Sequence, residues 1–198
     1  EAKRSLQLTH PHIVRLLTFD QDEARGGLAF LVMQHVQGQT LNEHLATHPD
    51  GIPLDRVQAW ASHIAAAIDH AHERGVLHRD IKPSNIMIDA SGNASLMDFG
   101  IAREAKDTMT RVTGRDSSGT LPYMSPQQLR GENAPSNDIY SFAATLYEAI
   151  SGDPPFTTGD LQHQILREPP KPIAGAPAAV NAALAAGLSK DAAARPPN

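Results

Sequence analysis

A short polar segment near the middle of the chain constrains its fold and chemistry more than any other feature. The segment reads His78-Arg79-Asp80-Ile81-Lys82-Pro83-Ser84-Asn85, and Asp98-Phe99-Gly100 follows it. Carboxylate and side-chain amide oxygens of the kind carried by Asp80, Asn85 and Asp98 are ligands that Mg²⁺ prefers. Lys82 adds a positive charge that could reach an anionic ligand. The alternative is a chance loop of solvated polar residues, and the presence of two co-linear motifs argues against it.

The two motifs resemble the catalytic loop and metal-binding turn of eukaryotic-type protein kinases, which have the form H-R-D-L-x-x-x-N and D-F-G. A second block, Gly119-Thr120-Leu121-Pro122-Tyr123-Met124-Ser125-Pro126, makes bacterial serine/threonine protein kinases the nearest group. The resemblance implies ATP and Mg²⁺ as cofactors and transfer of the γ-phosphate to serine or threonine of protein substrates. Such a transfer asks the protein mainly to position groups and to neutralise charge.

The resemblance also implies roles for single residues. Asp80 is expected to be the catalytic base, Lys82 to reach the transferred phosphate, and Thr120 to help present the hydroxyl substrate. Asn85 and Asp98 are expected to hold the metal. The adenine end of the nucleotide is expected to contact Met33 at the gatekeeper position and Met87 below the ring. The hinge residues expected beside it are Gln34, His35 and Val36. Plain strand and core roles are the alternative for these five. Glu1 stands where the family has a helix glutamate that pairs with a strand lysine.

Regulation by phosphorylation is a further expectation from the family. In this family, an arginine that directly precedes the catalytic aspartate pairs with a phosphate on the activation loop. Arg79 stands at this position, and Arg103 would be its companion. A phosphate adds about −1.5 to −2 charge and orders a loop by pairing with arginines. Thr113 and Ser117 are the expected sites. Two alternatives stay open: the loop hydroxyls are only solvated, or Asp116 supplies a built-in negative charge.

Other residues are expected to support the loop without taking part in chemistry. The expected contacts are His78 with Phe99, Asp138 with His72, and Gln127 with Arg195. The family usually has glutamate where this chain has Gln127, and a neutral amide should bind a guanidinium more weakly than a carboxylate does. The pairs at positions 10 and 12 and at 70 and 72 raise the possibility of a histidine metal site. Residues two apart on a helix do not share a face, so such a site is not expected.

The hydrophobic pattern predicts a mixed α+β chain. It predicts a hairpin at 13–19 and 28–33, helices at 41–48, 57–71, 139–150 and 160–166, strands at 86–88 and 95–97, and a helix after a loop within 174–194. The stretch from 98 to 127 has no period, which is typical of a functional or disordered loop. Residues 1–8 have helical propensity.

This order of elements resembles the protein-kinase fold over nearly the whole chain. Residues 1–36 correspond to a partial small lobe, the end of helix C plus a β-hairpin, without the glycine-rich loop and the strand lysine. Residues 37–198 correspond to a nearly complete, mostly helical large lobe whose last helix is truncated. The chain is therefore expected to be a fragment that is inactive alone.

Composition excludes several other classes of protein. The net charge of −5 argues against a nucleic-acid partner. The absence of cysteine excludes a disulfide scaffold and thiolate metal sites, and it fits a reducing compartment. No apolar run approaches the roughly 20 residues that span a bilayer. The segment is expected to be cytoplasmic and free of membrane contact. Many bacterial relatives continue into a membrane span, so the cytoplasmic domain of a membrane protein stays open as an alternative.

Two other functions remain as alternatives. A pseudokinase or scaffold would keep the fold without turnover. The predicted magnesium and base residues argue against it, and a strand lysine, expected upstream of Glu1, would discriminate further. A small-molecule phosphotransferase of similar fold would share the Asp-x-x-x-x-Asn spacing but lack Arg79, Lys82 and the 119–126 block. Fold resemblance alone does not separate these functions. The site residues favour the protein kinase.

Overall fold

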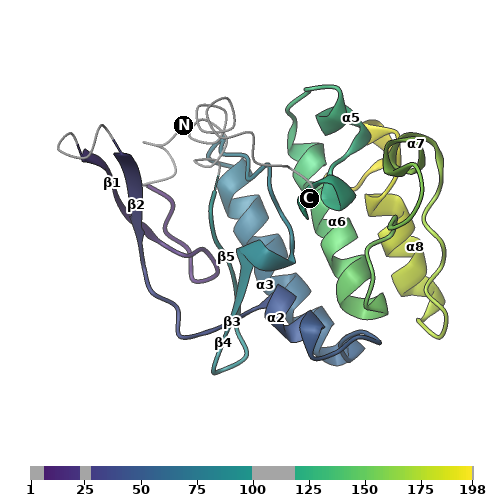
Figure 1. Ribbon diagram of the computed structural model, residues 1–198, viewed down its shortest axis with the longest axis horizontal. Helices are drawn as coiled ribbons and strands as arrows, with labels where there is room; N and C mark the ends of the chain where they lie inside the picture. Colours follow the sequence, from purple (N-terminus) through teal and green to yellow (C-terminus); the bar gives the residue numbers. More distant parts are fainter. Residues whose placement is uncertain (1–6, 23–27, 100–118, 198) are drawn as a thin grey trace.

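The computed structural model describes residues 7–22, 28–99 and 119–197, which form two small antiparallel sheets and a group of helices (Figure 1). Strand β1 (Leu16–Asp22) pairs with β2 (Leu28–Met33) and carries a register shift near its start. The second sheet has the order β3-β4-β5, formed by Gly38–Thr40, Ile86–Asp89 and Ala94–Leu96. A parallel bridge from Ile13 to Leu96 connects the segment before β1 to β5.

The helices occupy most of the rest of the described chain. They are α2 (Leu41–Ala46), α3 (Leu54–His72), α5 (Pro126–Leu129), α6 (Pro135–Ser151), α7 (Leu161–Arg167) and α8 (Ala178–Gly187), with single 3₁₀ turns at 83–85, 121–123 and 192–194. Helix α6 packs between α3 and α8, and the second sheet lies against α3 (Figure 1). The β1–β2 hairpin and α8 therefore lie at opposite ends of the molecule.

The core forms where the apolar face of α3 meets α6 and the second sheet. Val57, Trp60, Ile64 and Ile68 are buried along one face of α3, as the helical period requires. Helix α6 begins with proline at its first turn and ends at Gly152, whose φ of 88° is the left-handed conformation that glycine adopts without strain. The core therefore fixes the positions of α3 and α6. Helix α3 precedes the polar segment at 78–85 in the sequence, and α6 contacts that segment in space.

Most predicted elements are present, and three regions differ from expectation. Strand β3 was not predicted, because three residues carry no period and the strand exists only through its pairing with β4. The stretch from 98 to 127 is not loop throughout, since its described part includes the turn at 121–123 and the start of α5. Ser125 begins α5 with a capping box that Gln128 completes. Helix α8 is shorter than the predicted stretch, and residues 1–6 and the turn at 26–27 lie outside the described residues.

Within the described ranges, no helix combines the length and the apolar character needed to cross a membrane.

Candidate active site

A buried carboxylate on α6 holds the polar loop that follows α3. Asp138 is 1% exposed. Its Oδ2 accepts hydrogen bonds from His78 N and from His72 Nε2, both at 2.8 Å, and its Oδ1 accepts one from Arg79 N at 2.8 Å. Bonds to an ionised acceptor are stronger than neutral ones. The backbone just before Asp80 is therefore fixed to the core of the domain.

Arg79 adopts an uncommon backbone conformation that its neighbours stabilise. Its φ is 69°, a region that costs a non-glycine residue about 1–3 kcal/mol. The Arg79 N–H is bound by Asp138, and its carbonyl accepts from Gln128 Nε2 at 2.8 Å. Sequence reasoning did not single out Gln128, although the Ser-x-x-Gln capping pattern at the start of α5 was an available signal. Helices α6 and α5 together hold the two peptide units on either side of the Arg79 Cα atom.

Three predicted catalytic side chains meet in one triangle of contacts. Lys82 Nζ lies 3.0 Å from Asp80 Oδ2 and donates to Thr120 Oγ1 at 2.8 Å. The Thr120 hydroxyl donates to Asp80 Oδ1 at 3.1 Å. The side chains of Lys82 and Asp80 are 16% and 15% exposed, so both remain accessible from solvent. The tertiary structure thus brings Thr120 next to two residues that lie far away in sequence.

The two predicted metal ligands come from neighbouring segments. Asn85 Nδ2 donates to the main-chain oxygen of Asp80 at 2.6 Å and to its Oδ2 at 3.2 Å, which leaves the amide oxygen for a ligand. The main-chain oxygen of Asn85 accepts from Met97 N at 2.9 Å. Met97 directly precedes Asp98, whose φ of 65° is again uncommon for a non-glycine residue. Asn85 and Asp98 are therefore held on adjacent backbone segments.

His78 is a structural ring, as the sequence predicted. Its Nε2 donates to Met97 O at 2.7 Å, its Nδ1 accepts from Asp80 N at 3.2 Å, and its ring meets Phe99 edge-on at 4.7 Å. Burial lowers the pKa of His78 and outweighs the opposite effect of Asp138. The neutral ring connects the loop that carries Asp80 to the turn that carries Asp98.

The predicted contact between Gln127 and Arg195 is also present. Arg195, which is 5% exposed, donates from Nη2 to Gln127 Oε1 at 2.6 Å. Its Nε and Nη1 donate to the main-chain oxygens of Ser189 and Ser136 at 2.8 and 2.9 Å, and Gln127 Nε2 donates to Lys190 O at 2.9 Å. Neutral acceptors thus satisfy the buried guanidinium, and α5 is tied to the segment after α8.

The residues expected around adenine lie on and after β2 and on β4. Met33 ends β2, the Gln34 N–H donates to Arg15 O at 2.8 Å, and Gln34 and His35 are exposed. Val36 and Met87 are partly buried. The remaining predicted residues, which are Glu1, Arg103, Thr113 and Ser117, lie outside the described residues.

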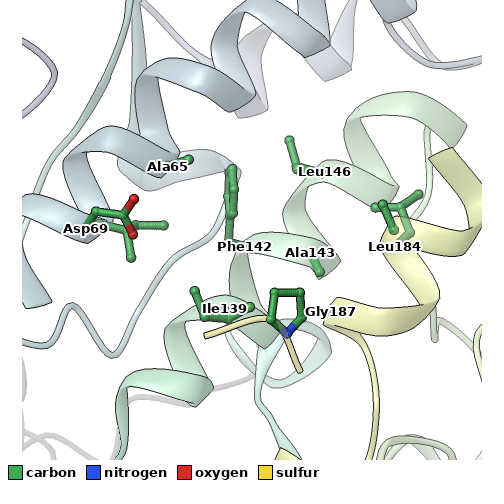
Figure 2. Close-up of a pocket in the computed structure, with 11 residues that line it drawn as sticks. Ala65, Asp69, Ile139, Phe142, Ala143, Leu146, Leu184 and Gly187 are labelled. Atoms are coloured by element: carbon green, nitrogen blue, oxygen red, sulfur yellow. The ribbon is translucent and has the colours of Figure 1, made fainter. Parts of the chain in front are cut away.

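An apolar cavity of about 200 Å³ lies between α3, α6 and α8, away from these residues (Figure 2). Ala65, Phe142, Leu146 and Leu184 line it, with Asp69 as the one carboxylate. None of the predicted site residues lines this cavity. Among the residues that the structure describes, no group of three or more His, Cys, Asp or Glu side chains could hold a metal ion.

The loop held by α6, the turn that follows β5 and the helical core define the chain as a protein kinase domain. A family model described as protein kinase domain matches residues 1–189, and the chain belongs to this family. It is similar to the serine/threonine-protein kinase PknB of Mycobacterium tuberculosis, with 37% identity over 207 residues that cover 100% of this chain and 32% of that protein.

The chain is also similar to serine/threonine-protein kinases of other bacteria. The serine/threonine-protein kinase PknB of Mycolicibacterium smegmatis is 38% identical over 179 residues, which cover 87% of this chain and 28% of that protein. The probable serine/threonine-protein kinase PknB of Bifidobacterium longum is 34% identical over 207 residues, which cover 96% and 30%. The chain spans about a third of the length of the curated relatives that it matches.

Proposed function

We propose that the protein transfers the γ-phosphate of ATP to serine or threonine hydroxyls of protein substrates, with Mg²⁺ as the metal. The triangle of Asp80, Lys82 and Thr120 carries this proposal, because it places a carboxylate, a cation and a hydroxyl within 3.1 Å of one another at a partly exposed site. The printed names of the relatives, which are serine/threonine-protein kinases, support the same reaction.

In this proposal Asp80 accepts the proton of the attacking hydroxyl. Its carboxylate is oriented by bonds from Thr120 and Asn85 and by the Lys82 charge, so little rearrangement is needed when substrate arrives. Lys82 can turn from Asp80 towards the transferred phosphate, where its charge stabilises the transition state. Thr120, held against both residues, positions the substrate hydroxyl.

Asn85 and Asp98 would hold Mg²⁺ together with the nucleotide phosphates. Their amide and carboxylate oxygens suit this ion, which commonly uses one or two protein carboxylates plus substrate phosphates. The bound ion would supply neutralisation of the charge on the phosphates. Met33, Gln34, His35, Val36 and Met87 would contact the adenine end, and Glu1 would pair with a strand lysine.

We further propose control by phosphorylation of the segment between Asp98 and Thr120. Arg79 and Arg103 would pair with a phosphate on Thr113 or Ser117, because a dianionic phosphate forms strong bonds with arginines and can order a loop. Residues 1–36 would belong to the small lobe and residues 37–198 to the large lobe. The domain would act in the cytoplasm, where ATP is supplied.

Two substitutions in protein expressed from the complete reading frame test the reaction. Asp80→Asn and Asp98→Asn should each lower the rate of phosphate transfer to a protein substrate by several orders of magnitude, about what positioning and electrostatic effects supply. The melting temperature should stay close to that of the wild type. Asp50→Asn, at an exposed aspartate, is the matched control and should keep full activity. Turnover close to wild type in Asp80→Asn or Asp98→Asn would contradict the assignment.

The same assay separates the alternatives. Wild-type protein that binds ATP without transferring phosphate would favour a pseudokinase or scaffold. Transfer to a small molecule, with no labelling of serine or threonine in proteins, would favour the small-molecule phosphotransferase.

A further inference from the structure

Four histidine rings form a continuous row between α3 and the segment that precedes β1. The His12 ring stacks on His63 with centroids 4.0 Å apart and an angle of 9° between the planes. His10 lies 5.6 Å from His12 and 4.9 Å from His70. His63 and His70 belong to α3, so the row, called here the histidine array, joins two parts of the chain that are distant in sequence.

Hydrogen bonds to the backbone require two of these rings to be neutral. The ring of His63 accepts from Ala94 N through Nδ1 at 3.2 Å, and the ring of His10 accepts from His12 N through Nδ1 at 3.2 Å. A protonated imidazole has no acceptor nitrogen. Protonation of His63 or His10 therefore removes its backbone bond and leaves two N–H donors facing each other. The His12 ring, by contrast, donates from Nδ1 to Ala94 O at 2.9 Å, a bond that protonation keeps.

Protonation also places like charges side by side. A second cation in the His12–His63 stack would lie 4.0 Å from the first. Burial lowers the pKa of His10, and the neighbouring His70, His12 and Arg74 lower it further. Burial lowers the pKa of His63, His12 adds to this effect, and Asp89 opposes it. The structure thus favours the neutral form of His10 and of His63.

The array is connected through β5 to the turn that carries Asp98. Val14 N donates to Leu96 O, and Leu96 N donates to His12 O, both at 2.9 Å. These bonds join the segment at 12–14 to the last residue of β5, and Asp98 follows two residues later. A change in how His12 is held therefore acts directly on the strand that leads to Asp98.

We propose that the histidine array is an acid-sensitive clamp, in which protonation of His10 and His63 detaches the segment at 10–14 from α3 and β5 and loosens the strand that leads to Asp98. Any consequence for phosphate transfer rests on the proposed function, whereas the detachment does not.

The direction of the pH effect follows from linkage. The folded-state pKa of His10 and of His63 lies below the ordinary value of 6.5, so the detached state takes up protons first as pH falls. The clamp is therefore fully closed above pH 6.5 and opens progressively below it.

Amide hydrogen exchange on residues 1–198, followed by NMR and corrected for the intrinsic pH dependence, tests the proposal. Between about pH 7.5 and about pH 5.5, the wild-type amides of Val14, Ala94 and Leu96 should lose protection by up to about tenfold for each histidine. A group protonated only in the detached state changes the opening equilibrium by at most about a factor of ten per pH unit below its ordinary pKa of 6.5. In the His10→Asn/His63→Asn variant the loss should be less than about twofold. Asparagine offers an uncharged oxygen that can accept from the same amides.

His48→Asn is the matched control, at a histidine that follows α2 and lies outside the array, and the amides of Val14, Ala94 and Leu96 should behave in it as in the wild type. Equal loss of protection in the wild type and the double variant, or no loss in the wild type, would overturn the proposal.

Ring-proton NMR titration of the wild type gives a second measurement that needs no variant. His10 and His63 should titrate below pH 6.5, and their titration curves should depend on the protonation of the neighbouring histidines, as expected for coupled sites. Independent titration of both at the ordinary value would also overturn the proposal. Because neither measurement uses ATP, a protein that transfers no phosphate at any pH would count against the proposed function alone.

Discussion

The substitution Asp138→Asn should weaken the fold and disorder the loop that carries Asp80. The aspartate is 1% exposed and accepts from His78 N, His72 Nε2 and Arg79 N, each at 2.8 Å. Asparagine keeps the shape of the side chain but has a single acceptor oxygen. In its better orientation that oxygen replaces Oδ2, which bonds His78 and His72, and the amide nitrogen then faces the Arg79 N–H.

The expected cost follows from these bonds. One buried donor left without a partner costs about 1–3 kcal/mol, and each of the other two bonds loses about 0.5–1 kcal/mol when its acceptor becomes neutral. We expect the free energy of unfolding to fall by about 3 kcal/mol, more than a hundredfold in the folding equilibrium. Arg79, with its φ of 69°, would also lose the bond to its N–H, while the bond from Gln128 to its carbonyl stays.

Urea unfolding of residues 1–198 measures this change, with Asp50→Asn as the matched control at an exposed aspartate. The control should stay within about 0.5 kcal/mol of the wild type. Exchange at the amides of His78 and Arg79 should become faster in Asp138→Asn before global unfolding. A free energy of unfolding within about 0.5 kcal/mol of the wild type would refute the view that Asp138 holds the loop.

Three further outcomes are expected. Gln127→Ala should lower the free energy of unfolding by about 1–3 kcal/mol in urea melts, because the buried Arg195 loses its 2.6 Å bond; a neutral effect would show that water replaces the amide. Burial lowers the pKa of His78, so the free energy of unfolding should fall as pH drops below 6.5. Urea melts across this pH range should show a weaker pH dependence for His78→Leu than for the wild type. The same pH dependence in both proteins would contradict this prediction. Mass spectrometry of active protein from the complete reading frame should find phosphate on Thr113 or Ser117, whereas full activity of an alanine block over the loop hydroxyls would favour Asp116 as a built-in charge.

Local sequence patterns predicted much of the fold, because a helix or hairpin is encoded within its own residues. The stripe of Val57, Ile64 and Ile68 and the stop at Gly152 identify α3 and α6 without knowledge of their partners. Strand β3 was missed for the converse reason. Its three residues have no distinctive pattern, and only their pairing with β4 makes them a strand.

The sequence by itself also predicted which groups carry the chemistry, since the two motifs place Asp80, Asn85 and Asp98 at a recognisable spacing. It indicated several supporting contacts by resemblance, among them those of His78 with Phe99 and Gln127 with Arg195, and the structure contains both.

The tertiary structure alone decided how the loop is held and what surrounds it. Gln128 binds Arg79 O across 49 residues of sequence, and Ala94 N meets the His63 ring across 31. A hydrophobic period specifies which face of an element is buried, but it does not specify which distant side chain meets a given backbone amide. Such partners are set only when α3, α5, α6 and β5 pack together, and this packing allows Arg79 and Asp98 to adopt positive φ angles that their own sequence does not favour.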